Sequence, residues 1–302
     1  MITDRDIQIL TLLVRYYLLS RDQIQRLCFS AIASSRSAAR KTRERLQNLV
    51  TLGLIHRHKF EFYNPSDGRP APLYYPSRKG CEFLAEHLED QRYLTTAVHT
   101  PVAQYARHWL ALNETHIALD AAIARQNAVQ LDGWINEFDI VNKDESAPEK
   151  RYRLYTLLRE SPRLVCAPDA AFLLSVADYR KVFYVEQDRG TSGVRHIAAS
   201  KMPGYVQLAE SRLHRRHFPT TTFDTFTVLI VAPNPRRRDA LRHAIKSFPG
   251  ADLWKFVSAT ELTPESFLDA PIVYPCDGEP KPLVRVRSDV ASLITNGGEK
   301  QS

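Results

Sequence analysis

Cysteine is scarce in this chain, and its few cysteines stand far apart. Four occur among 302 residues, with no Cys-x-x-Cys pair and no Cys/His cluster at zinc spacing: Cys28, Cys81, Cys166 and Cys276. This pattern excludes a disulfide framework and the usual structural zinc site. Scattered cysteines are typical of free, mostly buried thiols in a reducing compartment. We therefore expect a cytoplasmic protein.

Long hydrophobic runs are missing as well. No stretch approaches the ~18 apolar residues that a membrane-spanning helix needs. The opening segment, residues 1–6, is charged and leads directly into a helical pattern, so we expect no signal peptide. Neither a Walker loop nor a dinucleotide-binding glycine pattern occurs. These absences argue against a membrane protein and against nucleotide-driven chemistry.

Positive charge is in surplus, and the surplus is uneven. The formal net charge is +7, in a chain that is 44% hydrophobic and 25% charged and long enough for two domains. Residues 1–100 hold 15 Lys and Arg against 10 Asp and Glu. Because most of the surplus lies in this third of the chain, a polyanionic partner is expected to bind there.

The first hundred residues show three helical segments followed by a hairpin. A capping pattern opens the first helix at Thr3, a short second helix begins after Ser20, and a third runs from Ser34 to about Leu52. Two strands joined by a turn follow the third helix. This order predicts a winged helix-turn-helix domain over residues 1–97.

The third predicted helix carries a basic face. Its polar stripe follows the spacing i, i+4, i+7 and i+11 and consists of Arg36, Arg40, Arg43 and Gln47. The adjoining stripe is apolar and can pack on the first two helices. Arginines on such a face contact phosphates or guanine in the major groove of double-stranded DNA. The predicted wing adds three cations for the DNA backbone, Arg57, Lys59 and Arg69. A solvated helix face is the alternative, since arginine also favours helices.

Two apolar runs in the middle of the chain place carboxylates at strand ends. Asp169 follows Pro168 at the start of the first run, and Glu186 and Asp188 close the second. Side chains alternate along a strand, so Glu186 and Asp188 are expected on the same face. If the two runs pair as a hairpin, the three carboxylates converge, and a divalent cation would relieve their repulsion. Ordinary surface carboxylates at strand ends are the alternative.

These residues carry a family resemblance. Pro168-Asp169 followed by Glu186-x-Asp188 resembles the PD-(D/E)xK nuclease core with its final lysine replaced. The longer text, from Pro-Asp-Ala through Tyr-Val-Glu-Gln-Asp-Arg-Gly-Thr to Lys-Met-Pro-Gly-Tyr, resembles the replication-relaxation family of plasmids and integrative elements, which is related to the MobC-type mobilisation relaxases. The resemblance covers most of the chain. It implies a second domain over residues 98–270 and an overall α/β (α+β) fold.

The second domain is expected to be a restriction-endonuclease-like mixed sheet, with the element order helix, three strands, helix, strand. The resemblance implies that Asp169 and Glu186 hold Mg²⁺ or Mn²⁺ and that Asp188 belongs to the catalytic group. Glu114, in a predicted helix, joins the metal site by analogy; an ordinary helix-surface glutamate is the alternative. Residues 271–302 are expected to form a partly disordered tail.

Lys201 is the candidate for the missing lysine. It begins a predicted helix after the second apolar run, and its ammonium could stabilise the attacked phosphate; an exposed structural lysine is the alternative. Tyr205 is either a nucleophile or a packed aromatic. The basic cluster 236–238 opens another helix and opposes its dipole, so we expect an anion beside it. The single His-x-His, residues 56–58, has a charged middle residue, which argues against a histidine-based relaxase mechanism.

We therefore expect a DNA-binding protein that nicks or relaxes origin DNA in mobilisation or replication through a metal-dependent site. The rival is a non-catalytic DNA-binding regulator or accessory protein whose nuclease domain is degenerate. The replacement of the lysine by Asp188 favours that rival. Further candidate partners are other mobilisation or replication proteins and a second copy of the chain.

Overall fold

The chain divides into two compact units, Met1–Asn113 and Glu114–Ser302. The computed structural model describes all residues except 59–71, 97, 99 and 286–302. The division falls within one long helix, α5 (Ala103–Ile123). The described helices include none that is long and apolar enough to cross a membrane. The domain limits at residues 97 and 270 stay predictions.

The N-terminal unit combines helices with a small antiparallel sheet. Its described strands follow the order β1-β3-β2. The elements are α1 (Asp4–Tyr16), β1 (Leu19–Ser20), α2 (Arg21–Phe29), α3 (Ser35–Thr51), β2 (Ile55–His58), β3 (Leu73–Pro76), α4 (Arg78–His87) and the 3₁₀ helix η2 (Gln91–Thr95).

The predicted caps begin these helices. The Ser20 hydroxyl accepts a hydrogen bond from the Gln23 N–H at 3.2 Å, and the Ser34 hydroxyl accepts one at 3.4 Å. Such caps satisfy amide groups that the first helical turn leaves without a partner. Helix α1 is joined to α3 by an ion pair, in which Nε of the partly exposed Arg45 lies 2.8 Å from Oδ1 of the buried Asp6.

The C-terminal unit is built on a mixed sheet, which confirms the predicted α/β class. Among the described residues, six strands follow the order β11-β10-β9-β8-β7-β4. Strands β4, β7 and β8 are antiparallel, whereas β8, β9 and β10 are parallel. The sheet consists of β4 (Gln130–Asn136), β7 (Ala170–Val176), β8 (Tyr179–Gln187), β9 (Thr227–Ala232), β10 (Trp254–Ser258) and β11 (Tyr274–Pro275).

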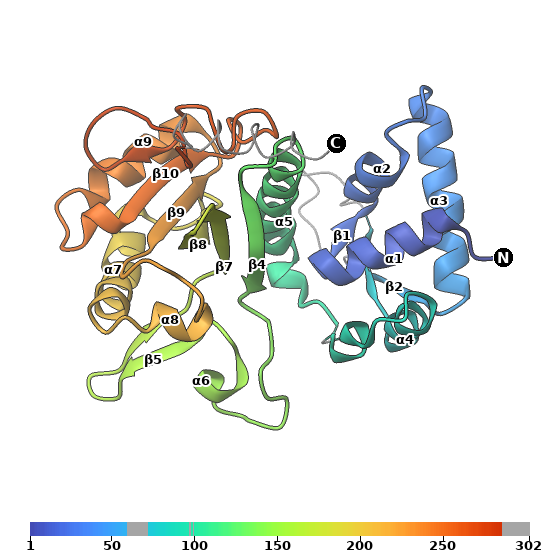
Figure 1. Ribbon diagram of the computed structural model, residues 1–302, viewed down its shortest axis with the longest axis horizontal. Coiled ribbons are helices and arrows are strands. Elements are labelled where there is room, and N and C mark those ends of the chain that lie inside the picture. Colours follow the sequence, from blue (N-terminus) through green and yellow to red (C-terminus); the bar gives the residue numbers. More distant parts are fainter. Residues whose placement is uncertain (59–71, 97, 99, 286–302) are drawn as a thin grey trace, which may run out of the picture. The chain divides into compact units, whose positions relative to one another are not determined.

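The helices of this unit lie on both faces of the sheet, as Figure 1 shows. Besides α5, they are α6 (Pro148–Arg151), α7 (Val194–Glu210), α8 (His214–His217), α9 (Pro235–Ile245) and the 3₁₀ helix η3 (Ala251–Leu253). A separate two-stranded sheet is formed by β5 (Thr156–Arg159) and β6 (Leu164–Cys166). The predicted order of helix, three strands, helix and strand is present as α5, β4, β7, β8, α7 and β9.

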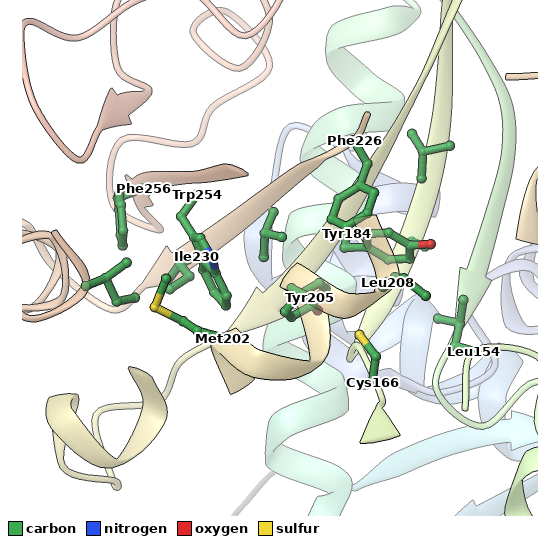
Figure 2. Packing of buried hydrophobic residues seen from close by; sticks show 14 of the residues in the cluster. Leu154, Cys166, Tyr184, Met202, Tyr205, Leu208, Phe226, Ile230, Trp254 and Phe256 are labelled. Atoms are coloured by element: carbon green, nitrogen blue, oxygen red, sulfur yellow. The ribbon is translucent and has the colours of Figure 1, made fainter. Parts of the chain in front are cut away.

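One face of the sheet holds the main core, beneath α7 and α9. Tyr205 of α7 lies edge-on to Trp254 at 5.1 Å, and Tyr184 of β8 lies edge-on to Phe226 at 4.9 Å (Figure 2). On the other face, the ring of His116 in α5 stacks on Trp134 at 3.9 Å. Because both faces are covered, the central strands are continuous apolar runs without polar alternation.

The structure differs from the sequence-based prediction in two connections. The turn expected over residues 178–181 is shorter, because Ala177 takes the left-handed conformation (φ 49°) and β8 starts at Tyr179. The segment after residue 271 contributes a strand, since β11 pairs with β10. Residues 286–302 lie outside the described residues. All four cysteines are free, and three of them are buried.

Candidate functional site

The β7–β8 hairpin brings two of the predicted carboxylates together. Ala170 pairs with Val185, so Asp169 and Glu186 lie opposite each other one residue further along. The Gln187 N–H donates to Asp169 Oδ2 at 2.7 Å. The two side chains are only 13% and 7% exposed, respectively. We refer to Asp169 and Glu186 as the acidic pair.

Lys201, from helix α7, points its ammonium at the acidic pair. Its Nζ lies 2.7 Å from Glu186 Oε2 and 3.7 Å from Asp169 Oδ1. It also donates to the Ala167 carbonyl oxygen at 3.3 Å. The Lys201 side chain is one-third exposed, more than either carboxylate. Lys201 follows Glu186 by 15 residues in sequence, yet its ammonium lies beside the carboxylates. The position at which the PD-(D/E)xK motif has its lysine is occupied in this chain by Asp188.

Tyr205 lies one helical turn after Lys201 and contacts the same carboxylate. Its hydroxyl donates to Glu186 Oε1 at 2.6 Å, and the residue is 1% exposed. A hydroxyl enclosed in this way cannot reach a DNA phosphate without a rearrangement of the core. The position favours the packed-aromatic interpretation, with the additional task of orienting Glu186.

The electrostatics of the site follow from burial and close charges. Burial raises the pKa of Glu186 to about 7; Lys201 opposes this shift and Asp169 adds to it. Burial disfavours the charge of Lys201, but Glu186 and Asp169 outweigh it, and the pKa of Lys201 is raised. Lys201 therefore remains an ammonium at neutral pH, while Glu186 can bind or release a proton there. Such a perturbed group is typical of functional sites.

The third predicted carboxylate has a different partner. Asp188 is held by Arg237 of α9, with Nε at 2.6 Å from Oδ2 and Nη2 at 3.1 Å from Oδ1. This pair accounts for part of the basic cluster at the start of α9, and Arg238 binds Glu261 at 2.7 Å. The anions expected beside that cluster are thus carboxylates of the same chain.

Glu114 lies at an exposed position of α5. Its neighbour Thr115 is buried and donates its hydroxyl to Gln187 Oε1 at 2.8 Å, which ties α5 to the end of β8. A metal-binding role for Glu114 therefore stays a prediction. Sequence reasoning did not find Thr115 or Gln187, because each acts through a contact distant in sequence. It singled out Arg237 within the cluster 236–238 but did not find Asp188 as its partner.

The acidic pair has the donor chemistry for Mg²⁺ or Mn²⁺. Both groups are carboxylates, the hard oxygen donors that these ions prefer, and a cation already lies between them as the Lys201 ammonium. Within the described part of the chain, no three His, Cys, Asp or Glu side chains are grouped as a metal site. Mg²⁺ is commonly held by one or two carboxylates together with water and substrate phosphates, so two protein ligands fit.

The basic stripe of α3 is exposed, and its other side is buried. The exposed residues are Arg36, Arg40, Arg43 and Gln47. The buried residues are Ala38, Thr42, Leu46 and Leu49. Arg57 is exposed on β2. Lys59 and Arg69, and the tip of the expected wing, lie outside the described residues.

Comparison with known proteins gives one match. Residues 10–222 match the replication-relaxation family, and this range is more than half of the chain. Neither a curated protein nor a solved structure matches it. The matched range contains the basic helix α3, the acidic pair and Lys201. The chain therefore belongs to the replication-relaxation family.

Proposed function

We propose that this protein binds double-stranded DNA of a plasmid or integrative element through its N-terminal unit and nicks it through the acidic pair and Lys201. Membership of the replication-relaxation family supports a role in DNA replication or mobilisation. The net charge of +7 is consistent with a nucleic-acid partner.

The N-terminal unit supports the DNA-docking part of the proposal. Its order of α1, α2 and α3, followed by β2 and β3, is typical of winged helix-turn-helix domains. In such domains the third helix enters the major groove. The exposed arginines of α3 would then contact phosphates and base edges, while its buried face packs inside the unit.

One observation carries the catalytic part of the proposal. Each carboxylate of the acidic pair has one oxygen fixed by the protein and the other oxygen turned toward Lys201. The Gln187 N–H fixes Asp169 Oδ2, and the Tyr205 hydroxyl fixes Glu186 Oε1. The remaining oxygens face a single cation. An ordinary surface ion pair does not need both oxygens of each carboxylate to be fixed in this way. Such fixation is typical of a site that is preorganised for a ligand.

The residues of the chain have distinct tasks in this proposal. A Mg²⁺ or Mn²⁺ ion on Asp169 and Glu186 would polarise the scissile phosphate and lower the pKa of a bound water. Lys201, displaced from between the carboxylates, would place its ammonium against the negative charge that develops on the phosphate. Glu186, with a pKa of about 7, can hold a proton near neutral pH. Tyr205 and Gln187 keep both carboxylates oriented.

Nicking of supercoiled plasmid in Mg²⁺ or Mn²⁺ tests the proposal. Wild type should produce open circles, and Asp169→Asn and Glu186→Gln should not. Glu265→Gln, an exposed glutamate elsewhere in the unit, is the matched control and should nick normally. All four proteins should bind DNA equally in a fluorescence anisotropy assay, because the changes lie outside the N-terminal unit.

A non-catalytic DNA-binding protein is the second candidate function. Two observations favour it: Lys201 already neutralises the acidic pair, and Asp188 at the motif's lysine position is engaged by Arg237. Under this alternative the acidic pair is a structural ion pair. DNA binding without any nick, in every protein and with either metal, would select it.

A further inference from the structure

A second charged site lies elsewhere on the same sheet. A cavity of about 320 Å³ is lined by Lys181 and Phe183 of β8, Lys255 of β10 and residues up to Arg285. Lys181 and Phe183 alternate with Tyr184 and Glu186, so they belong to the opposite face of β8. Glu186 follows Lys181 by five residues along the extended strand, a distance of about 16 Å. The cavity is thus distinct from the acidic pair.

The walls of this cavity are strongly cationic. Four basic side chains line it, Lys181, Lys255, Lys281 and Arg285, and the described residues around it include no carboxylate. Burial lowers the pKa of Lys181, and the charge of Lys255 lowers it further. Burial also lowers the pKa of Lys255, against the opposing influence of Cys276 and Asp252. The lysines therefore repel one another in a partly dry environment.

Lys181 and Lys255 contact uncharged groups, and no carboxylate among the described cavity walls neutralises them. Lys255 Nζ donates to the backbone oxygen of Asp252 at 2.9 Å. Lys181 Nζ lies over the rings of Phe183 and Phe223, at 5.8 and 5.7 Å from their centroids. A carbonyl and two aromatic faces orient ammonium groups but do not neutralise them. An anion entering the cavity would do so.

Apart from Thr227 of β9, the remaining lining residues are apolar and come from the segment that follows β10, namely Val273, Pro275, Pro282 and Leu283. A ligand that fits must therefore combine a concentrated negative charge with an apolar or aromatic part. A phosphate monoester carries about −1.5 to −2 charges at pH 7 and three acceptor oxygens. A backbone phosphodiester carries a single negative charge, so it would neutralise less of the positive charge of the four cations.

We propose that this cavity binds a terminal phosphate group attached to a nucleoside, either as a free nucleotide or as the 5′ end of a DNA strand. The site is separate from the proposed nicking chemistry, and its test is a binding measurement on the full chain. The two sources share the phosphomonoester, and they are distinguished by the probes.

Calorimetric titration with AMP, adenosine, and a hexanucleotide with either a 5′-phosphate or a 5′-hydroxyl provides the test. AMP should bind and adenosine should not. Lys181→Met and Lys255→Met should each weaken AMP binding about tenfold or more, the loss expected for one charge-assisted contact. Lys246→Met removes an exposed lysine that is paired with Asp277 outside the cavity, and it should bind AMP like wild type.

The hexanucleotides identify the source. Tighter binding of the 5′-phosphorylated strand than of the 5′-hydroxyl strand indicates a DNA end, and equal binding of the two strands alongside AMP binding indicates a free nucleotide. Both methionine variants should melt no lower than wild type, because each removes a repelled charge and keeps an apolar stem. If either melts lower, Lys281→Met at an exposed position must show the same tenfold loss. Absence of AMP binding, or equal weakening by Lys246→Met, would overturn the proposal.

Discussion

Lys201 is the residue on which the charge balance of the acidic pair depends. Its ammonium contacts both carboxylates, and both are nearly enclosed. Removing it leaves two like charges together, a situation that usually costs about 3–5 kcal/mol of folding stability when a buried pair is broken. Protonation of Glu186, whose pKa is about 7, would absorb part of that cost.

We expect Lys201→Met to lower the Tm at pH 8 and to abolish nicking. Mn²⁺ should then raise the Tm of this variant more than that of wild type, because the ion no longer competes with the ammonium. Differential scanning fluorimetry with and without Mn²⁺ measures both effects, and Lys246→Met is the control. If Mn²⁺ leaves the Tm of Lys201→Met unchanged, metal binding by the acidic pair is contradicted.

His217 provides a pH-dependent prediction in the core. Burial lowers its pKa to about 4, and Arg216 and Arg153 add to the shift. Its ring lies 2.6 Å from the Tyr184 hydroxyl and 3.1 Å from the Thr156 hydroxyl, contacts that fit a neutral imidazole. In the unfolded chain the pKa is about 6.5. The unfolded state therefore binds a proton first as the pH falls.

Folding stability should consequently be lost as the pH falls from about 6.5 to about 4, by roughly 3 kcal/mol for this group. Urea unfolding at several pH values measures the loss. His217→Gln should flatten the dependence over this range, and His243→Gln, an exposed change on α9, should retain it. A dependence that is equally steep in His217→Gln would show that other groups cause it.

At the scale of single residues, the sequence predicted the candidate site residues more reliably than it predicted the contacts between them. The strand pattern predicted that Asp169 and Glu186 converge, because a hairpin is local. The contact between Asp188 and Arg237 joins residues 49 apart and depends on how α9 packs. The alternation that places Asp188 and Glu186 on one face does not reveal that a guanidinium will engage one of them.

Helix α7 is the element that positions Lys201 and Tyr205. Its Gly204 lies against β6, and a Cβ added there would stand 2.5 Å from the Val165 carbonyl oxygen. That distance is shorter than van der Waals contact and involves backbone on both sides. The glycine therefore permits the close approach that directs both side chains of α7 to Glu186.

Gly204→Ala should push α7 away from β6 and destabilise the unit by about 1–3 kcal/mol, the usual cost of overpacking. Nicking should fall with it, because Lys201 and Tyr205 move. Gly193→Ala, at the start of the same helix with no atom within 4 Å of the added Cβ, should leave the Tm nearly unchanged. Equal Tm values for the two variants would refute this account of α7.

Elements with local signals were predicted well. Serine caps and apolar periodicity located α2 and α3, and continuous apolar runs located β7, β8 and β9. The strands β5 and β6 and the short α6 were not predicted, because β5 and β6 are only four and three residues long and pair with each other apart from the main sheet. Turn position was also misjudged where Ala177 adopts a conformation that favours glycine.

In the whole molecule, the proposed function assigns DNA affinity and DNA cleavage to different units. Affinity is assigned to the exposed arginines of α3, and phosphate contacts make such binding steeply dependent on salt. Replacing Arg36, Arg40 and Arg43 with glutamine should weaken binding and reduce the slope of log affinity against log salt by about 0.9 for each lost phosphate contact. Fluorescence anisotropy in a salt series measures the slope.

Arg92→Gln serves as the control for this series, since Arg92 is an exposed arginine of the same unit outside α3. It should change neither the affinity nor the slope appreciably. An α3 triple variant that binds DNA as wild type does would show that the basic stripe is only a solvated helix face. The cleavage site, if intact, would then have to reach DNA by another surface.

The most direct measurement of the central claim is metal-dependent nicking of a supercoiled plasmid by wild type and by the two variants of the acidic pair. The account predicts open circles with wild type in Mn²⁺, and a rate at least roughly a hundredfold lower in Asp169→Asn and Glu186→Gln. Open circles formed equally by all three proteins, or by none while DNA binding persists, would contradict it.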